Sequence, residues 1–355
     1  MFLLAGLPLL LALVVPAAAG KPLPSRIEPT AGRITGLAFD GSRVVYGVQP
    51  NGSGVRTVHV WNVATGTGGV IHRHGGGAGF AVAGSRAAWI ARGGSASETD
   101  EYLLTTSLPR VRLRQLAVAV RFTDSYSQVE HGRWLSGLVG SGNVIAVSSW
   151  TTASDGAVSS ARLSLVGETR LRPIVVGQNA IVAESADAGR IAVVRSTAIW
   201  PGQFRLTGGP GSVGVYSTGG KLVSEVNRGT AKEAALSGNS LAVLTTANTI
   251  ELYNATTGAF VRSWPVPAGA AHLDLQSGIA VYAVYPRSSP ARKLHVLRLS
   301  TGKDVVIATG EAPYPYAQGD DAQIDELGLV YAQNIRTHGK LVFLPMARVL
   351  AKLHG

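Results

Sequence analysis

Residues 39–47 read FDGSRVVYG: an apolar run, a tight turn around Gly41 and a second apolar run. The same arrangement returns six more times, with successive turn glycines 40 to 58 residues apart. The further turn glycines are Gly84, Gly142, Gly189, Gly238, Gly278 and Gly328. A repeat of this length, built from short strands and tight turns, is typical of one four-stranded propeller blade with a variable loop. The sequence therefore predicts an all-β fold, a seven-bladed β-propeller.

Residues 34–355 are expected to form this propeller as one domain, because each blade of a radial repeat packs only on its neighbours. Six or eight blades are the alternatives, since the interval between Gly84 and Gly142 is the longest. The last blade can be completed from either end, by the C-terminal RVLAKL or by the segment Arg26–Arg33. Residues 20–33 are accordingly a linker or the ring-closing segment.

Three stretches, VHVWNVATG, IELYNATTG and LHVLRLSTG, share a strand that runs into a Thr-Gly turn ending at Gly66, Gly258 and Gly302. In these residues the chain resembles the broad group of bacterial propeller repeats that includes TolB-like, WD40-like and quinoprotein-like families. The resemblance covers about residues 34–353. The chain departs from true WD40 repeats because asparagine, not aspartate, follows Trp61. The resemblance implies a propeller architecture and no particular chemistry.

The first nineteen residues, MFLLAGLPLLLALVVPAAA, are uncharged and apolar and end in a small-residue site at Ala17 and Ala19. This pattern predicts a signal peptide over residues 1–19, cleaved before Gly20. An uncleaved membrane anchor is the alternative, but two prolines interrupt a run that is short for a bilayer span. No later stretch is long and apolar enough to cross a membrane, so we expect a secreted or extracytoplasmic protein without a transmembrane segment in the mature chain.

The composition restricts the kinds of reactive site and of partner that the chain can have. The chain has no cysteine, which excludes disulfides, thiol nucleophiles and thiolate metal sites. Its net charge of +11 favours anionic cell-surface polymers or lipid head groups as partners. Arg110, Arg112 and Arg114 alternate on a predicted outer strand, where charges also discourage edge-to-edge association. We expect a monomer whose partner is an unknown protein or a cell-surface polymer, and no nucleic-acid module is recognisable.

The connections between strands differ on the two sides of the predicted disc. Tight glycine turns join first to second and third to fourth strands, whereas the remaining connections carry the length. Because binding groups concentrate on loops held by a rigid frame, the side with the long loops is the expected ligand site. The alternative is that these loops are tolerated insertions without a ligand.

Three long insertions, at 123–134, 197–211 and 310–323, combine aromatic and charged residues. Such combinations suit sugar, peptide or aryl ligands, since a ring supplies contact area and a charge fixes orientation. The alternative is that the rings pack their own loops against the disc. The predicted ligand-binding residues are Tyr126, Trp134, Trp200, Arg205, Tyr314 and Tyr316.

No catalytic signature appears in a supporting context, so the favoured function is a non-enzymatic binding or scaffold protein acting through the long-loop side. The alternative is an extracytoplasmic lyase or hydrolase for a sugar or peptide-like ligand, with His131, His338 and Glu130 as candidate acid-base residues. That alternative requires the three side chains to converge around one cavity.

Metal and cofactor binding are not expected. Asp320 and Asp321 are the candidate ligands for a calcium ion, because hard cations take carboxylate oxygens. Their spacing from Asp325 and Glu326 does not match an EF-hand loop, and those two acids are expected to flank the turn before Gly328. We therefore predict no metal and no cofactor.

Overall fold

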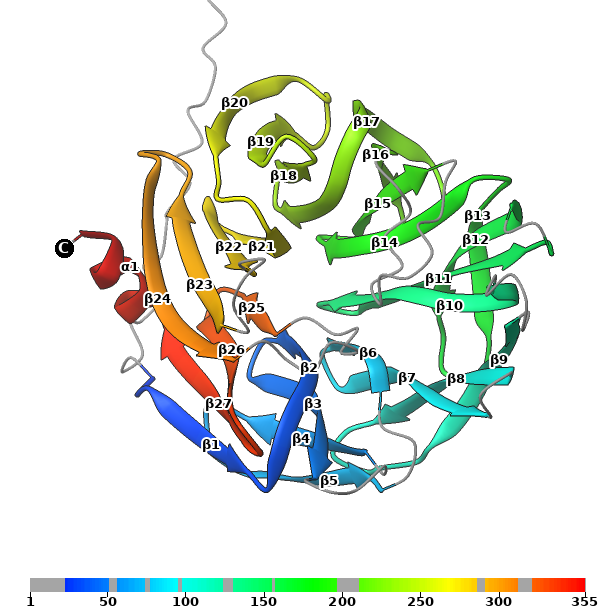
Figure 1. The fold of residues 1–355 in the computed structure, drawn as a ribbon, viewed down its shortest axis with the longest axis horizontal. Coiled ribbons are helices and arrows are strands. Elements are labelled where there is room, and N and C mark those ends of the chain that lie inside the picture. Colours follow the sequence, from blue (N-terminus) through cyan, green and yellow to red (C-terminus); the bar gives the residue numbers. More distant parts are fainter. Residues whose placement is uncertain are drawn as a thin grey trace, which may run out of the picture.

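The computed structural model describes residues 23–50, 56–73, 77–94, 98–123, 130–154, 157–196, 211–285, 291–311 and 321–354. The predicted signal peptide, residues 1–19, lies outside this part of the chain. Strands make up 74% of the structure and helices 3%, so the sheets form the frame. The sheets stand around a central axis, with β2, β6, β10, β14, β21 and β25 nearest to it (Figure 1). This radial arrangement of antiparallel sheets is that of a β-propeller.

The strands follow one another in antiparallel groups of four, each running from the axis outward, and we call each group a blade. The first blades are β2 (Gly32–Asp40), β3 (Arg43–Pro50), β4 (Thr57–Asn62) and β5 (Gly68–His72); β6 (Gly77–Ala83), β7 (Arg86–Gly94), β8 (Glu98–Ser107) and β9 (Arg114–Thr123); and β10 (Glu130–Ser141), β11 (Val144–Thr152), β12 (Val158–Val166) and β13 (Leu171–Gly177). Next come β14 (Ala180–Asp187), β15 (Arg190–Ser196), β16 (Gly211–Ser217) and the first part of β17 (Leu222–Ser237); then the rest of β17 with β18 (Ser240–Thr245), β19 (Thr249–Asn254) and β20 (Phe260–Pro265). The remaining strands are β21 (Ala270–Gln276), β22 (Ile279–Val284), β23 (Ala291–Arg298) and β24 (Lys303–Glu311), and then β25 (Ala322–Ile324), β26 (Gly328–Ile335), β27 (His338–Pro345) and β1 (Arg26–Thr30), with the helix α1 (Met346–His354).

Tight turns join the innermost strand of a blade to the second. In the β14–β15 turn, Ala188 and Gly189 have φ of 47° and 74°, and in the β21–β22 turn Ser277 and Gly278 have φ of 49° and 76°. Two successive residues in the left-handed region give the turn whose twist matches right-twisted strands, and glycine adopts it without a steric cost. Gly189 and Gly278 therefore occupy hairpin turns, as the sequence predicts.

Apolar side chains of consecutive blades form the core. Phe39, Trp61 and Phe343 belong to the cluster between blade β2–β5 and the blade of β25–β27, and the two phenylalanine rings meet edge to face at 6.2 Å. The other clusters lie in the same way between consecutive blades. Stability therefore comes from a series of neighbour interfaces, which needs no disulfide.

The N-terminal strand β1 completes the last blade. It pairs antiparallel with β27 over five residue pairs. Of the two segments that the sequence offered for this place, the structure therefore selects the one at the N-terminal end. The C-terminal RVLAKL lies instead in α1, where Val349 and Leu353 pack against the apolar cluster of β22 to β27. Within the described residues, no helix has the length and apolar character needed to cross a membrane.

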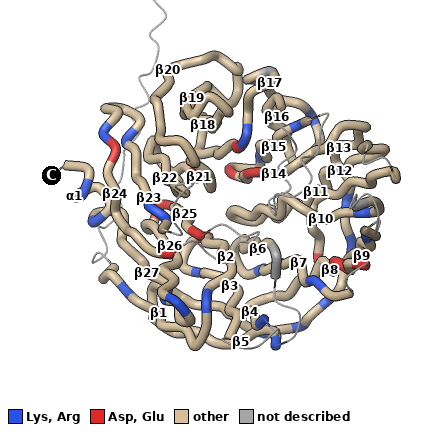
Figure 2. The backbone as a smooth tube through the Cα atoms, viewed as in Figure 1, with Lys and Arg blue, Asp and Glu red and all other residues tan. Residues whose placement is uncertain are grey.

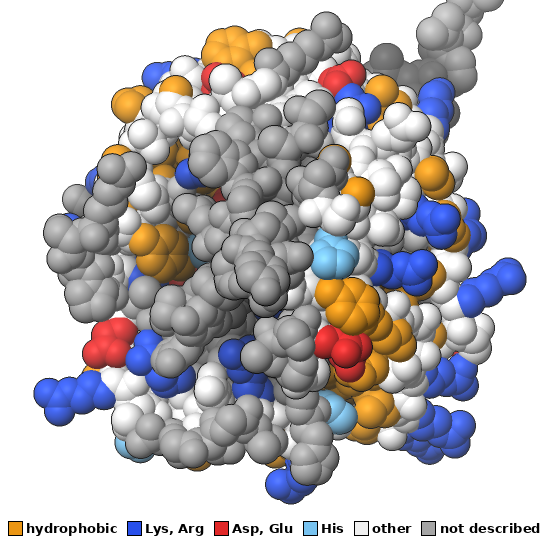
Figure 3. All heavy atoms as spheres, turned by 45° about the vertical axis from the view of Figure 1, so that its right-hand side comes forward, with side chains coloured by type: hydrophobic (Ala, Val, Ile, Leu, Met, Phe, Trp, Pro, Cys, Tyr) orange, Lys and Arg blue, Asp and Glu red, His pale blue; other side chains and the backbone are white. Residues whose placement is uncertain are grey.

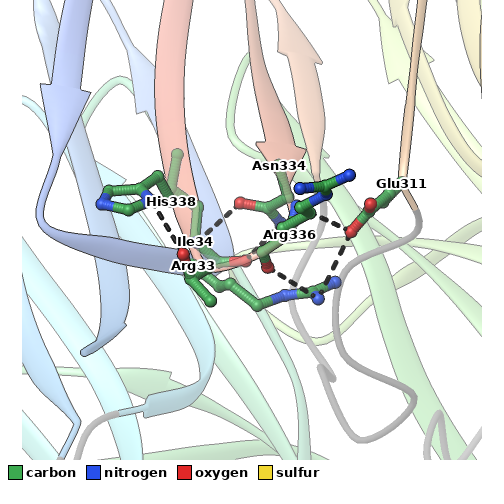
Figure 4. A network of polar contacts seen from close by, with 7 residues as sticks. Arg33, Ile34, Glu311, Asn334, Arg336 and His338 are labelled. Carbon is green, nitrogen blue, oxygen red and sulfur yellow. Dashed lines mark hydrogen bonds and ion pairs between the residues drawn. The ribbon is translucent and has the colours of Figure 1, made fainter. Parts of the chain in front are cut away.

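Polar contacts fix the same junction between β2 and the strands at the C-terminal end (Figure 4). The Asn334 side chain accepts the N–H of Ile34 at 2.9 Å and donates to the Ile34 carbonyl at 3.0 Å. Arg33 Nη1 lies 3.5 Å from Glu311 Oε2 and donates to the Arg336 carbonyl at 3.1 Å. The Arg336 N–H in turn donates to Glu311 at 2.9 Å. The ring is thus closed by side chains as well as by strand pairing.

The two sides of the disc carry connections of different length. We call the side of the β2–β3 turn and its equivalents the hairpin face, and the opposite side the long-loop face. On the hairpin face the strand bounds leave at most six residues between strands, as at 108–113. On the long-loop face they leave up to fourteen, at 197–210, and ten at 312–321. The predicted asymmetry of the two faces is therefore present at these two connections, whereas 95–97 and 178–179 on the long-loop face are as short as turns of the hairpin face.

Side-chain oxygens join different blades by accepting backbone N–H groups. Nearer the long-loop face, Glu101 accepts from Leu135, Ser148 from Ala183 and Glu233 from Leu273, at 2.8–2.9 Å. At the hairpin face, Asp40 accepts from Gly84 and Gly142, Ser185 from Leu236, Ser237 from Ser277, Asp274 from Ile324 and Gln323 from Phe39, at 2.6–3.1 Å. Because a buried N–H without a partner is costly, these contacts hold the blades in register.

Candidate functional site

A small cavity lies on the axis at the hairpin face, where the innermost strands end. Its volume is about 70 Å³. Five acidic residues, Asp40, Glu184, Asp187, Asp274 and Asp325, line it. Acidic positions on β14 and near β25 lie beside the axis in Figure 2. We call these five acidic residues the acidic mouth. Their negative charge contrasts with the net charge of +11 of the chain.

Most of these acids already serve the frame. Asp40 accepts N–H groups from two other blades, through Gly84 and Gly142, both at 2.9 Å. Asp187 and Asp274 each accept an N–H from the following blade. The volume is also far below the roughly 300–1,000 Å³ of small-molecule pockets. The acidic mouth is therefore a structural ring and not the better candidate for a ligand site.

Asp325 differs from the other acids of the acidic mouth because one of its carboxylate oxygens is buried without a described partner. Its Oδ1 accepts the N–H groups of Leu327 at 2.7 Å and Gly328 at 3.2 Å, while its Oδ2 is buried without a partner among the described residues. Burial raises the pKa of Asp325 to about 7, and the negative charges of Asp40 and Glu326 add to that effect. The carboxyl group therefore loses its proton near neutral pH.

This raised pKa predicts a pH-dependent stability. The folded state holds the Asp325 proton between pH 3.8 and about 7, whereas the unfolded chain releases it, so the free energy of unfolding falls as pH rises through this window. Asp325→Asn keeps the Oδ1 acceptor and removes the charge. We expect it to raise the free energy of unfolding at pH 8 by about 1–3 kcal/mol and to flatten the profile from pH 4 to 8.

Urea unfolding of the native chain and of Asp325→Asn across this pH range measures the effect. Exposed Glu168→Gln, which does not contribute to the raised pKa of Asp325, is the control and should retain the slope. Equal slopes for the native chain and Asp325→Asn would contradict the assignment.

At the long-loop face, buried charges hold the ends of two connections. Glu101, which is wholly buried, accepts from Arg92 Nε at 2.9 Å and Nη2 at 2.7 Å, and Arg121 Nη1 lies 2.8 Å from the same oxygen. The other oxygen of Glu101 accepts the N–H of Leu135. We call Arg92, Glu101 and Arg121 the Glu101 cluster. It ties β7, β8, β9 and β10 together where the connections 95–97 and 124–129 begin and end.

Trp134, a predicted ligand-binding residue, belongs to this arrangement. The Arg121 guanidinium lies 4.0 Å from the centre of its ring, and the Trp150 ring stacks at 6.4 Å. The indole N–H donates to Thr152 Oγ1 at 3.0 Å. With 4% of its surface exposed, Trp134 packs β10 and presents no open ring face in this structure.

A second buried cluster lies at the same face, between blade β21–β24 and the last blade. Arg292 and Asp321, each 1% exposed, form an ion pair, and Arg292 Nη2 donates to the Ala332 carbonyl at 2.6 Å. The Tyr285 hydroxyl donates to Asp321 at 2.8 Å. We call Tyr285, Arg292 and Asp321 the Asp321 cluster. It holds the residues on either side of 286–290 and the residue that follows 312–320.

The surroundings of Asp321 bear on its predicted part in metal binding. Although burial raises the pKa of Asp321, the positive charge of Arg292 outweighs it and holds the pKa below its usual value. The described residues contain no group of three or more His, Asp or Glu side chains that could hold a metal ion. Asp320 lies outside the described residues. In this structure Asp321 is an ion-pair residue.

The candidate acid-base residues are placed on different blades. His131 lies on β10, with its ring 6.0 Å from that of Phe122, and exposed His338 lies on β27 with its Nδ1 2.8 Å from Thr337 Oγ1. The two strands lie on different sides of the axis (Figure 1). Glu130 begins β10, and its side chain lies outside the described atoms. The structure therefore does not bring His131 and His338 together.

The remaining predicted ligand residues belong to connections of the long-loop face. Those connections follow β9, β15 and β24. The residues Tyr126, Trp200, Arg205, Tyr314 and Tyr316 lie outside the described part of the chain. They stay predictions.

One polar group that the sequence analysis did not single out is centred on His295. Its Nδ1 lies 3.0 Å from Asp304 Oδ2, which also accepts the Tyr282 hydroxyl at 2.7 Å, and the Tyr282 and His295 rings stack at 4.9 Å. Tyr282 is wholly buried and His295 is 7% exposed. The three residues join β22, β23 and β24 as packing. Only their strand pairing reveals the group, because the sequence separates Tyr282 from Asp304.

Comparison with known proteins agrees with the fold. A solved structure of the WD40 repeats of RRP9 is 13% identical, with a TM-score of 0.53, and covers 90% of this chain and 97% of that one. The structure of U3-55K is also 13% identical, with a TM-score of 0.52, covering 90% of this chain and 98% of that one. No family model matches the sequence, and no curated protein matches it either. At this identity the likeness shows a β-propeller repeat fold alone.

Proposed function

We propose that the chain is an exported, seven-bladed β-propeller that binds a protein or a cell-surface polymer through its long-loop face without catalysis. Four strands to a blade, with β17 counted in two blades and β1 in the last, give the proposed count. A propeller fold supports a binding or scaffold role, since rigid blades present loops from a fixed frame. The two candidate histidines lie on different blades, so no described geometry favours the enzymatic alternative.

The observation that carries the proposal is the placement of buried charge. The Glu101 and Asp321 clusters both lie at the long-loop face, beside the ends of four connections. Buried ion pairs are costly to assemble, and they hold geometry more than they stabilise the fold. Here they fix the positions from which the loops with Tyr126, Tyr314 and Tyr316 depart. By contrast, the acidic cavity of the hairpin face is small and lined by groups bound to the frame.

The proposed export is consistent with the ring closure. Cleavage before Gly20 leaves β1, which begins at Arg26, intact. The leader could therefore be removed without loss of the strand that completes the last blade.

The test uses the full chain expressed with its own leader in a bacterial host. Exported protein is expected to begin at Gly20 by N-terminal sequencing. It is then screened by thermal shift against soluble cell-wall glycopeptides and unmodified short peptides. A probe at 100 times its Kd should stabilise the fold by about 2.7 kcal/mol.

Tyr314→Ala and Tyr316→Ala are expected to abolish this stabilisation. Phe260→Ala, which removes a ring exposed on the outer strand β20, should retain it. Material that stays in the cytoplasm with its leader attached would contradict export. No response to any probe, or a response that both tyrosine variants retain, would contradict binding through the long-loop face.

A further inference from the structure

A larger recess opens between blade β6–β9 and blade β10–β13. Its volume is about 260 Å³. β9 contributes Val118 to one wall, and β10 to β13 supply the other wall, with Leu135 and Leu171 among its apolar residues. β9 and β10 pair over only three residue pairs near the long-loop face. Beyond that contact the two strands follow different blades, which leaves room for the recess.

Two arginines line this recess from the same face of one sheet. Arg133 on β10 pairs with Thr151, and Arg162 on β12 pairs with Ser149. Thr151 and Ser149 are two residues apart on β11, so they and their partners share one side of the sheet. Both arginines are exposed, and neither guanidinium has a hydrogen-bond or ion-pair partner among the described residues. Two unpaired cations therefore flank β11 on the recess side.

Hydroxyl groups line the same recess as the two arginines. Ser149, Ser160 and Ser164 line the recess, and their side chains make no hydrogen bond to another described residue. No Asp or Glu is among the described residues that line the recess. Its donors are thus available to a ligand, and none of these described residues repels a negative charge. This is the reverse of the axial cavity, where acids are already bound to the frame.

We propose that this recess binds a tetrahedral oxyanion, the phosphate group of a phosphate ester or a sulfate group. Guanidinium groups donate paired N–H groups to such oxygens, and hydroxyls on the strand between them can complete the shell. Donors on three neighbouring strands, β10, β11 and β12, can each reach a different oxygen of a tetrahedral group, whereas a planar carboxylate has only two oxygens. The volume suits one such group with a small substituent, since it lies below the roughly 300–1,000 Å³ of drug-sized pockets.

The surrounding charge favours the same class of ligand. Figure 3 turns the edge of the disc that carries β9 to β13 toward the viewer, and Lys and Arg side chains are spaced along it. With a net charge of +11, the chain attracts anions to this edge before they reach the recess. The site is independent of the proposed long-loop binding face, so either can fail without the other.

Isothermal titration calorimetry on the full mature chain tests the proposal, with glycerol 3-phosphate and inorganic sulfate as probes at constant ionic strength. Glycerol is the neutral control and acetate the planar one. We expect saturable one-to-one binding of at least one tetrahedral probe. Arg133→Gln and Arg162→Gln should each weaken it by about tenfold, the loss of a charge-assisted hydrogen bond. A preference for either probe identifies the source of the oxyanion and supports the site.

Arg110→Gln is the matched control, because it removes the same charge from an exposed position outside the recess. It should leave the affinity unchanged, and near-native circular dichroism should confirm that the exposed substitutions fold. Absence of saturable binding by both tetrahedral probes would overturn the proposal. So would acetate binding as tightly as they do, or an equal loss of affinity in Arg110→Gln, which would indicate general attraction to a basic surface.

Discussion

Arg292→Met is expected to lower the free energy of unfolding by about 3–5 kcal/mol, because it leaves the carboxylate of Asp321 buried without its counter-charge. Arg292 also donates to the Ala332 carbonyl, so the substitution removes a contact to β26 as well. Both members of the pair are 1% exposed, and water cannot replace the missing partner. Chemical denaturation at pH 7 measures the loss.

The double variant Arg292→Met/Asp321→Leu separates the cost of an orphaned charge from the value of the pair. Replacing a buried ion pair with apolar residues of similar size is often neutral, so the double variant should recover most of the lost stability. Arg110→Met, at an exposed position without a partner among the described residues, should change stability by less than about 0.5 kcal/mol. A single variant as stable as the native chain would show that the Asp321 cluster does not hold the blades together.

Removing residues 20–31, and with them β1, is expected to destabilise the propeller by several kcal/mol and to cause self-association. The deletion takes away five residue pairs of the ladder with β27, at about 1 kcal/mol for each hydrogen bond. It also exposes the β27 edge, which can then pair with another chain. The effect should come from the ladder more than from apolar burial, since Ile27 is 60% exposed.

A synthetic peptide of residues 23–31 gives the test its specificity. Added to the truncated chain, it should restore the monomer on size-exclusion chromatography and raise the melting temperature, by adding a strand to the open edge. The same peptide with Glu28→Pro should not, since proline cannot donate to the ladder. A truncated chain that stays monomeric with a native melting temperature would contradict the closure by β1.

The sequence predicted those features of the fold that depend on residues close together in the chain. Gly189 and Gly278 occupy left-handed turn positions that few other residues adopt, so their spacing reported the hairpins directly. Ring closure could not be decided in this way. Arg26–Thr30 pairs with a strand more than 300 positions later, and the alternating pattern of a short edge strand does not specify its partner.

The candidate site was predicted less completely for the same reason. Asp321 stood out as a carboxylate, but its partner Arg292 lies 29 positions away, and only the pairing of blades brings them together. Trp134 is predicted in a long connection but lies within strand β10, where Arg121 and Trp150 bury its ring. The position of Asp40 directly before a turn glycine is a sequence feature that could have indicated the acidic mouth. The sequence analysis did not use it, because an aspartate before a glycine is already explained by the turn.

The closure by β1 also bears on the order in which the propeller can assemble during synthesis. The strand β1 is synthesised before all other strands, and its partner β27 is the last strand to be synthesised. The N-terminal segment therefore cannot form its hydrogen bonds with β27 until almost the entire polypeptide has been synthesised. Assembly of the final sector is a long-range step that follows the others, and contacts of such high sequence separation form slowly. Under the proposed export, a ring that cannot close before β27 is made stays open while the chain crosses the membrane.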